Sequence, residues 1–364
     1  SLVGSEMCIR DSFGMVENYT HLPIYILHGE KDNNVPPTES HKIVAKLQQF
    51  HQNFIYHEQP DAGHWFGNES VDWQPMIEFF RRHTNPISPL SIQFKTPNPS
   101  ISSTYAWTTI HSQITPEEFR NLLADAYPRR WQIAIKTENI ARLQLNIKHI
   151  MPQKEVILTI DNTEITIQKD LNTNLVRTTE EQWILTGEPN QFLKGATRND
   201  PIKQAFNKNM IWVYGTNGSD RENRALIAKV RYDQQVWWYR GNGNVQIVSD
   251  KDFNLDQFPN QNIILYGHAD INSAFDQLLA ASPIQVKHNI IKFGQLQYEG
   301  DYGVFFTYPR FDTDENLVGV IGMTTEKMIR ASQQARYFIS GVSCPDYAIS
   351  VSYTHLTLPT NREV

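Results

Sequence analysis

The sequence predicts an α/β protein in which two α/β segments flank a segment made mostly of strands. Three observations lead to this fold class. Near the N-terminus, short apolar runs and amphipathic stretches follow the order strand, loop, helix, strand, loop, helix, which is typical of parallel α/β units. The middle of the chain alternates apolar and polar residues, as half-buried strands do. The last part repeats a strand, a glycine and a helix three times.

The first segment is predicted to span residues 13–85. Leu22–Leu27 is a short apolar run bounded by turn residues, which suits a buried strand, and Asn53–Glu58 predicts the next strand. Ser70 is predicted as the N-cap of the second helix. The apolar faces of the two helices are formed by Ile43, Val44, Leu47 and Phe50, and by Trp73, Met76, Ile77 and Phe80. Because parallel sheets are covered by helices on both faces, two strands make a poor sheet, and we expect its remaining strands upstream.

Residues 86–198 are predicted to form a small antiparallel sandwich or barrel behind a proline-rich boundary at 85–99. One helical stretch, Thr115–Leu123, is expected to interrupt the strands, because its proline occupies the favoured first helical position. The alternation that predicts strands is seen at Ile133/Ile135, Leu143/Leu145/Ile147, Val156/Leu158/Ile160 and Ile165/Ile167.

Residues 199–350 are predicted to form a second, doubly wound α/β domain. Three apolar runs are each followed by a glycine and a helical stretch. The strands are Ile211–Tyr214, Ile263–Tyr266 and Leu317–Ile321, and the helices after them are Glu222–Tyr232, Ile271–Leu279 and Thr325–Ala335.

Composition excludes several classes of protein. The 364 residues contain 33 Lys and Arg against 39 Asp and Glu, a net charge of −6, which argues against a partner bound through nucleic-acid phosphates. No run of about 18 apolar residues is present, so no membrane span is predicted. Cys8 and Cys344 cannot build a disulfide framework. No His-x-x-x-His or paired-cysteine spacing is found, so we expect no metal and no cofactor.

The two ends of the chain do not fit the rest. Residues 1–12 (SLVGSEMCIRDS) and 351–364 (VSYTHLTLPTNREV) resemble translated sequencing-adapter read-through of the kind found on metagenomic gene sequences. The alternative is two short disordered tails. On the first interpretation, residues 13–350 are an internal fragment of a longer protein.

Asp32 and His64 are the residues that point to a reaction. Each follows a predicted strand of a parallel sheet, at the edge where such sheets carry their sites. In a triad of nucleophile, histidine and acid, the imidazole moves the proton and a carboxylate orients it. Acid before histidine fits the chain order serine, aspartate, histidine. Taken singly, each could be an ordinary loop residue, and the pair in this order carries the prediction.

The residues around this pair resemble a known family. Leu27–Pro36 (LHGEKDNNVP) and Asp61–Trp65 (DAGHW) look like the C-terminal end of an α/β-hydrolase, most of all the prolyl-oligopeptidase-like serine peptidases. The resemblance implies that Asp32 is the triad acid and His64 the base, with His28 shaping the loop of the acid. It also implies a peptide or ester substrate, and a periplasmic or secreted location would fit it.

The later segments resemble a C-terminal extension of some bacterial members of this group, for which we know of no assigned chemistry. The matching stretches are Val213–Thr216, Leu265–Asp270 and Trp237–Gly243. The oligomeric state stays open.

The nucleophile is missing from the pattern. No Gly-x-Ser-x-Gly elbow occurs in the 364 residues, and neither Ser5 nor Ser219 has the flanking glycines. The chain is therefore predicted to be a C-terminal fragment of a serine hydrolase, and this fragment is expected to be inactive alone. The alternatives are a carboxylesterase on the same fold and a non-catalytic binding or scaffold protein.

Two further motifs have structural explanations. Gly215–Gly218 could cradle a phosphate, but it matches no nucleotide-binding pattern, so a tight turn is favoured. The aromatic run at 237–239 could stack on a ligand, although core or interface packing is the commoner use of such residues. The carboxylates at 312, 314 and 315 are expected in a solvated loop.

Overall fold

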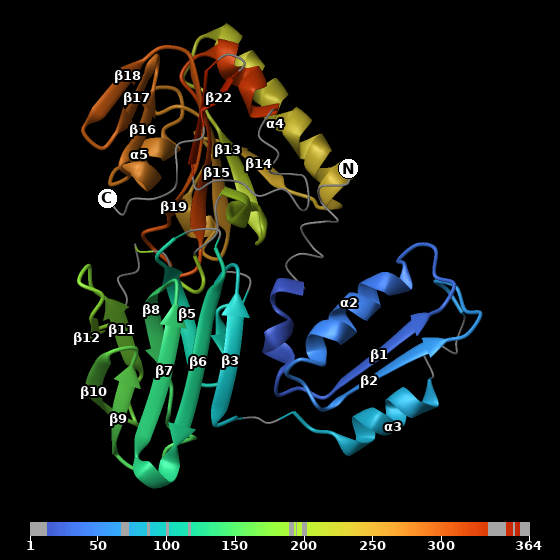
Figure 1. Cartoon of the computed structure of the whole chain (residues 1–364). Helices are drawn as coiled ribbons and strands as arrows, with labels where there is room; N and C mark the ends of the chain where they lie inside the picture. The colour runs from blue at the N-terminus through green and yellow to red at the C-terminus, as the bar shows by residue number, and fades with distance from the viewer. Residues whose placement is uncertain are drawn as a thin grey trace. The chain divides into compact units, whose positions relative to one another are not determined.

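The structure is a computed structural model that describes residues 13–66, 73–85, 88–99, 102–115, 118–188, 193, 195–198, 202–333, 347–351 and 354–356 (Figure 1). Two compact units make up this part of the chain. One contains the described residues up to 98 and from 102 to 188, and the other contains Pro99 and those after 188. Helices and strands are mixed in the chain, in agreement with the α/β class. In the described residues, no helix is long and apolar enough to cross a membrane.

The N-terminal part of the first unit has the predicted order of elements. After a short 3-10 helix, η1 (Val16–Tyr19), it consists of β1 (Ile24–Gly29), α2 (Pro37–Leu47), β2 (Phe54–Gln59) and α3 (Gln74–Arg82). β1 and β2 pair in parallel, as Figure 1 shows. Helix α2 begins with a proline, at the position where a missing N–H costs nothing. Ser70, the predicted N-cap, lies outside the described residues, and α3 begins after Trp73.

The rest of the first unit contains two five-stranded sheets with a common core. One sheet has the order β10-β9-β7-β6-β3 and the other β12-β11-β8-β5-β4. Their strands are β3 (Ser91–Thr96), β4 (Thr104–Tyr105), β5 (Thr108–Gln113), β6 (Arg120–Tyr127), β7 (Gln132–Glu138), β8 (Ile140–Leu145), β9 (Glu155–Ile160), β10 (Thr163–Gln168), β11 (Thr173–Arg177) and β12 (Trp183–Thr186), with a short 3-10 helix η3 (Pro128–Arg130). Ile92, Ile110, Leu143, Leu158 and Trp183, from five different strands, are buried in one cluster.

The sandwich differs from the antiparallel arrangement that we expected in one pairing. β7 and β9 are parallel. The chain leaves β7 for β8 in the other sheet and then returns to the first sheet beside β7, so the two neighbours run in the same direction.

Asp161 joins the two sheets. Its Oδ2 accepts hydrogen bonds from Trp183 Nε1 at 2.8 Å and from the Thr137 hydroxyl at 2.7 Å.

The helix expected at 115–123 is wrong. Residues from Arg120 onward form strand β6, in which burial alternates strictly from one residue to the next. Leu122 is completely buried, whereas Leu123 is 39% exposed. The adjacent leucines suggested a helical face, but pairing with β3 on one side and β7 on the other places them on opposite faces of a sheet. Tertiary pairing has overridden the local helix signal.

The second unit is built on a seven-stranded sheet of the order β14-β13-β15-β20-β19-β21-β22. The first four strands are parallel, and the last three run antiparallel to their neighbours. The strands are β13 (Met210–Tyr214), β14 (Gln246–Ser249), β15 (Asn262–Gly267), β19 (Tyr302–Pro309), β20 (Leu317–Met323), β21 (Tyr347–Val351) and β22 (Thr354–Leu356). The antiparallel half goes beyond the doubly wound pattern that the sequence predicted.

Apolar clusters cover both faces of this sheet. Helix α4 (Asp220–Gly241) contributes Leu226 and Val230 to the cluster around Trp212, and α5 (Ala274–Leu279) contributes Phe275 to the cluster around Val213. Because neighbouring residues of β13 point to opposite faces, the two helices lie on opposite sides of the sheet.

Several smaller elements complete the second unit. The helix expected at 325–335 is a 3-10 helix, η6 (Glu326–Gln333), and residues 334–335 lie outside the described ones. The other elements are η4 (Ile202–Phe206), η5 (Leu255–Gln257) and an antiparallel sheet of β16 (Ile284–Lys287), β17 (Ile290–Phe293) and β18 (Leu296–Glu299). Residues 1–12, which resemble adapter read-through, lie outside the described residues. Residues 351–364 also resemble adapter read-through; of these, Val351 belongs to β21 and residues 354–356 form β22, and the two strands pair.

Strand β6 can be tested with two neighbouring leucines. We expect Leu122→Ala to lower the free energy of unfolding by about 2–5 kcal/mol, because it leaves a cavity in the sandwich core. Leu123→Ala, on the exposed face, should change it by no more than about 0.5 kcal/mol. Urea denaturation followed by circular dichroism measures both. Equal losses for the two variants would contradict the strand.

Candidate active site

β1 and β2 end at the same edge of the first unit, because they pair in parallel and in register. Gly29, the last residue of β1, lies opposite Gln59, the last residue of β2. The loop after β1 carries Asp32, and the loop after β2 carries His64. Parallel sheets bind their ligands beyond the carboxyl ends of the strands. The two residues selected from the sequence therefore leave neighbouring strands on the same side.

The side chains of Asp32 and His64 meet directly. His64 Nδ1 lies 2.9 Å from Asp32 Oδ2, a hydrogen bond in which the ring nitrogen donates. The Asp32 side chain is only 7% exposed, whereas that of His64 is 30% exposed. The carboxylate is therefore protected from water, while the imidazole is open on the side away from it.

The approach of the two loops requires a glycine at the end of β1. A side chain at Gly29 would place its Cβ 2.4 Å from the carbonyl oxygen of Gly63 and 2.6 Å from that of Ala62, closer than atoms can come. The Lys31 N–H also donates to the Ala62 carbonyl at 2.8 Å. The backbone after β1 is thus held against the segment that precedes His64.

The backbone of its own loop holds the Asp32 carboxylate. Oδ1 accepts hydrogen bonds from the N–H groups of Asn34 and Val35, both at 2.9 Å. Burial by itself would raise the pKa of Asp32, but the hydrogen bonds from Val35, His64 and Asn34 outweigh it and lower the pKa to about 2. Asp32 is therefore ionised at neutral pH and oriented towards the imidazole.

His28 supports the loop of Asp32. Its Nδ1 accepts a hydrogen bond from the Ser40 hydroxyl at 2.6 Å, and its Nε2 donates to the Val35 carbonyl at 2.9 Å. Nε2 also lies 3.2 Å from Asp32 Oδ2. Because both ring nitrogens are engaged, His28 has no nitrogen left for proton transfer. The structure places it where a loop-shaping residue is needed.

The second ring nitrogen of His64, Nε2, is not used in the contact with Asp32. With Nδ1 donating to Asp32, Nε2 carries a lone pair, and no group of the described residues bonds to it. The ring of Trp65, which is 85% exposed, lies edge-on to the imidazole with centroids 5.0 Å apart. An oriented imidazole with a free, accessible nitrogen can accept a proton from a hydroxyl group and return it.

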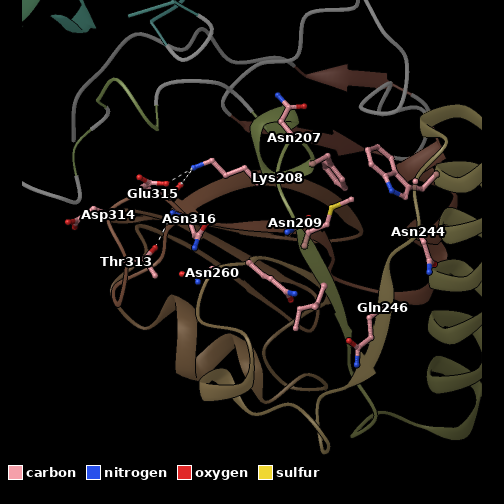
Figure 2. A pocket seen from close by; sticks show the side chains of 16 residues that line it. Asn207, Lys208, Asn209, Asn244, Gln246, Asn260, Thr313, Asp314, Glu315 and Asn316 are labelled. Carbon is pink, nitrogen blue, oxygen red and sulfur yellow. Dashed lines mark hydrogen bonds and ion pairs between the residues drawn. The ribbon is translucent and has the colours of Figure 1, made fainter. Parts of the chain in front are cut away.

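The second unit contains a large polar hollow that the sequence did not predict. It has a volume of about 1020 Å³ and lies at the amino ends of β13, β14, β15 and β20, the edge opposite to their carboxyl ends. Figure 2 shows Asn209, Asn244, Gln246, Asn260 and Asn316 around it, with Lys208 and Glu315 forming an ion pair at 3.5 Å. Amide side chains donate and accept hydrogen bonds but do not transfer protons at neutral pH. The carboxylates of Asp314 and Glu315 also line the hollow, so it offers both amide and charged groups to a ligand.

The remaining sequence motifs have structural roles. The Asn217 N–H donates to the Ile271 carbonyl at 3.0 Å, and the Gly218 N–H donates to Asn223 Oδ1 at 3.1 Å. Because both N–H groups bond within the protein, neither is available to bind a phosphate. Ser219 is the N-cap of α4, where it forms a capping box with Glu222.

The aromatic run is divided between core and surface at the end of α4. Trp237 packs against the core of the second unit, while Trp238 and Tyr239 are exposed.

Asp312 pairs with the fully buried Arg310, so this carboxylate has a structural partner in a loop that we expected to be solvated.

Comparison with known proteins places the Asp32–His64 pair in a family context. Residues 10–86 match the model of the prolyl oligopeptidase family, and this stretch contains both residues. A curated relative from Arthroderma benhamiae, named "Uncharacterized secreted protein", is 24% identical over 162 residues. The match covers 42% of this chain and 17% of the relative. No solved structure matches the chain. The N-terminal α/β part is thus similar to a family of serine peptidases.

The lowered pKa of Asp32 predicts how acid affects the first unit. Since the pKa is about 2 in the folded state and 3.8 ordinarily, the ionised carboxylate stabilises the fold. This contribution is complete above a pH of about 4 and is lost as the pH falls from about 4 to about 2. The difference in unfolding free energy between the wild type and Asp32→Asn, measured by urea denaturation, should shrink over this range. A difference independent of pH would contradict the hydrogen-bonded carboxylate.

Proposed function

We propose that residues 13–85 are the C-terminal part of the catalytic domain of a serine hydrolase of the prolyl-oligopeptidase type. Asp32 is the orienting acid and His64 the general base of a Ser-Asp-His triad that cleaves peptide bonds. The observation that carries this proposal is the 2.9 Å hydrogen bond from His64 Nδ1 to the buried Asp32 carboxylate, which leaves Nε2 accessible. The match of residues 10–86 to the prolyl oligopeptidase family supports it.

In the proposed triad the proton passes through His64. His64 Nε2 takes the proton of the serine hydroxyl while its oxygen attacks the carbonyl carbon of the substrate. The imidazolium formed is stabilised by Asp32, whose low pKa keeps it ionised. Nε2 then returns the proton to the leaving amine as the carbon–nitrogen bond breaks, and an acyl-enzyme remains. Water, deprotonated by the same nitrogen, then attacks the acyl carbon; the carbon–oxygen bond to serine breaks, Nε2 returns the proton to the serine oxygen, and the carboxylic acid product leaves.

The proposed activity needs a serine from outside these 364 residues. No Gly-x-Ser-x-Gly elbow occurs in the sequence. Since Asp32 and His64 can move a proton but form no acyl-enzyme, the chain by itself is proposed to be inactive. The nucleophile and its oxyanion hole would come from a longer protein that contains residues 13–85.

Two alternatives remain beside the peptidase. A carboxylesterase would use the same acid and base, and would differ in the pocket around the serine. A binding or scaffold function is favoured by one observation, the amide-lined hollow of about 1020 Å³ in the second unit. In the longer protein, a peptidase cleaves a proline-containing peptide efficiently, an esterase only a short acyl ester, and a scaffold neither.

Substitutions of the pair test the triad in the longer protein. We expect His64→Ala to lower kcat on the order of 10⁶-fold, because the general base is lost. Asp32→Asn should lower it by about 10⁴-fold, because the imidazole loses its orientation and its counter-charge. Steady-state hydrolysis of a chromogenic proline peptide and of an acyl ester measures both.

A second histidine–carboxylate pair in the same segment provides the matched control. His41 Nε2 lies 2.6 Å from Glu58 Oε2, but the His41 side chain is 52% exposed on α2, and within the described residues no bond joins this pair to Asp32 or His64. His41→Ala should keep nearly full activity. If His41→Ala loses as much activity as His64→Ala, then breaking any ion pair disables the protein. That result would contradict the assignment of His64 as the general base.

The chain alone should resist labelling at serine. A fluorescent phosphonate that reacts with activated serines is expected to leave the 364-residue chain unlabelled, because its sequence contains no Gly-x-Ser-x-Gly elbow. The longer protein should be labelled, and its His64→Ala variant should not. Stoichiometric labelling of the short chain would show that it contains its own nucleophile.

A further inference from the structure

Three potential ligand side chains meet at the carboxyl edge of the sheet in the second unit. Glu222 lies in the first turn of α4, His268 directly follows β15, and His288 lies in the turn between β16 and β17. One carboxylate oxygen and one nitrogen from each ring lie within 4.8 Å of one another. The rings of His268 and His288 are 5.6 Å apart between centroids.

The histidine at the centre of this group is buried, and no hydrogen-bond partner for it is found among the described residues. The His268 side chain is 2% exposed, and neither Nδ1 nor Nε2 forms a hydrogen bond within the described residues. The nearest carboxylate oxygen, Asp270 Oδ2, is 3.6 Å from Nδ1, too far for a hydrogen bond. A buried imidazole with two unsatisfied nitrogens is costly, so its presence calls for a ligand that the described part of the chain does not supply.

Two other histidines with little exposure, His51 and His28, show what a structural role looks like. His51 is buried in the first unit, where its Nε2 lies 2.8 Å from the carbonyls of Tyr19 and Leu22 and its Nδ1 accepts from the Asn53 N–H. His28 is satisfied on both nitrogens as well. His268 differs from both, because its nitrogens face a carboxylate and a second imidazole in place of backbone groups.

The charges around His268 favour a cation. Glu222 uses Oε2 in the capping box of α4, and its Oε1 lies 3.8 Å from His288 Nδ1. Asp270 adds a second carboxylate, which accepts a hydrogen bond from the backbone N–H of His288 at 2.7 Å.

We propose that His268, His288 and Glu222 bind a divalent transition-metal cation, with Zn²⁺ as the representative ion. Two imidazole nitrogens and one carboxylate oxygen are a ligand set that Zn²⁺ accepts, at about 2.0–2.2 Å from each ligand. Ligand atoms around a tetrahedral ion are about 3.4 Å apart by that geometry. Binding therefore draws the three atoms together by about 1 Å, which the exposed His288 side chain can provide.

The cavity on the buried side of this site is small. The hollow beside Glu222 and His268 has a volume of about 10 Å³ and is bordered by Leu226, Ile271 and Met323. Such a space holds one water at most and leaves no room for an organic substrate. The cation would instead join the start of α4, the end of β15 and the β16–β17 turn.

The test is a titration of the metal-free 364-residue chain with Co²⁺ and with Zn²⁺. We expect one Co²⁺ per chain with the visible absorption of a low-coordinate site, displaced by Zn²⁺. His288→Asn and His268→Gln should each weaken binding at least about tenfold. Glu222→Gln should weaken it too, although glutamine still completes the capping box. Zn²⁺ should raise the unfolding temperature of the wild type more than that of these variants.

His149→Asn is the matched control, because His149 is an exposed histidine of the first unit, and it should bind metal as the wild type does. If His268→Gln fails to fold, the exposed His288→Asn still decides the question. The proposal is overturned if the wild type binds no stoichiometric metal, if His288→Asn binds as tightly as the wild type, or if His149→Asn weakens binding equally. None of these outcomes depends on hydrolase activity.

Discussion

Parallel pairing of strands is the constraint on which both units depend. When neighbouring strands run in the same direction and in register, their carboxyl ends open at one edge, and the loops that follow them are brought together. In the first unit this places the loop of Asp32 beside that of His64. In the second unit it places His268, at the end of β15, beside the loop between β13 and α4. The candidate functional residues thus lie at equivalent places in two separate sheets.

The satisfaction of buried polar groups separates supporting residues from candidate functional ones. His28 and His51 use both ring nitrogens in hydrogen bonds, which fixes the loops around them. Among the described residues, His64 uses only the nitrogen that faces Asp32, and His268 uses neither. Since an unused nitrogen is tolerated only where it is solvated or meets a ligand, the bonding pattern of each histidine indicates its role better than its burial does.

Much of the fold and of the candidate site could be predicted from the sequence, and the failures have a common cause. The strand–loop–helix order of the first segment and the two loops that carry Asp32 and His64 were predicted because they rest on local patterns. The helix expected at 115–123 was wrong, because Leu122 and Leu123 look alike in sequence while strand pairing sends them to opposite faces. The parallel contact between β7 and β9 depends on the path of the chain between two sheets, for which local patterns carry no signal.

The sequence by itself determined which residues are able to do chemistry. The motifs around Asp32 and His64, and the missing serine elbow, are properties of short stretches of chain. Only the tertiary structure decided which residues meet. The contact of Glu222, His268 and His288, and the amides around the hollow, come from stretches that are far apart in sequence, and no spacing rule connects them. The reason is physical: local patterns report how each segment buries its own apolar face, whereas a site forms where the ends of several segments converge.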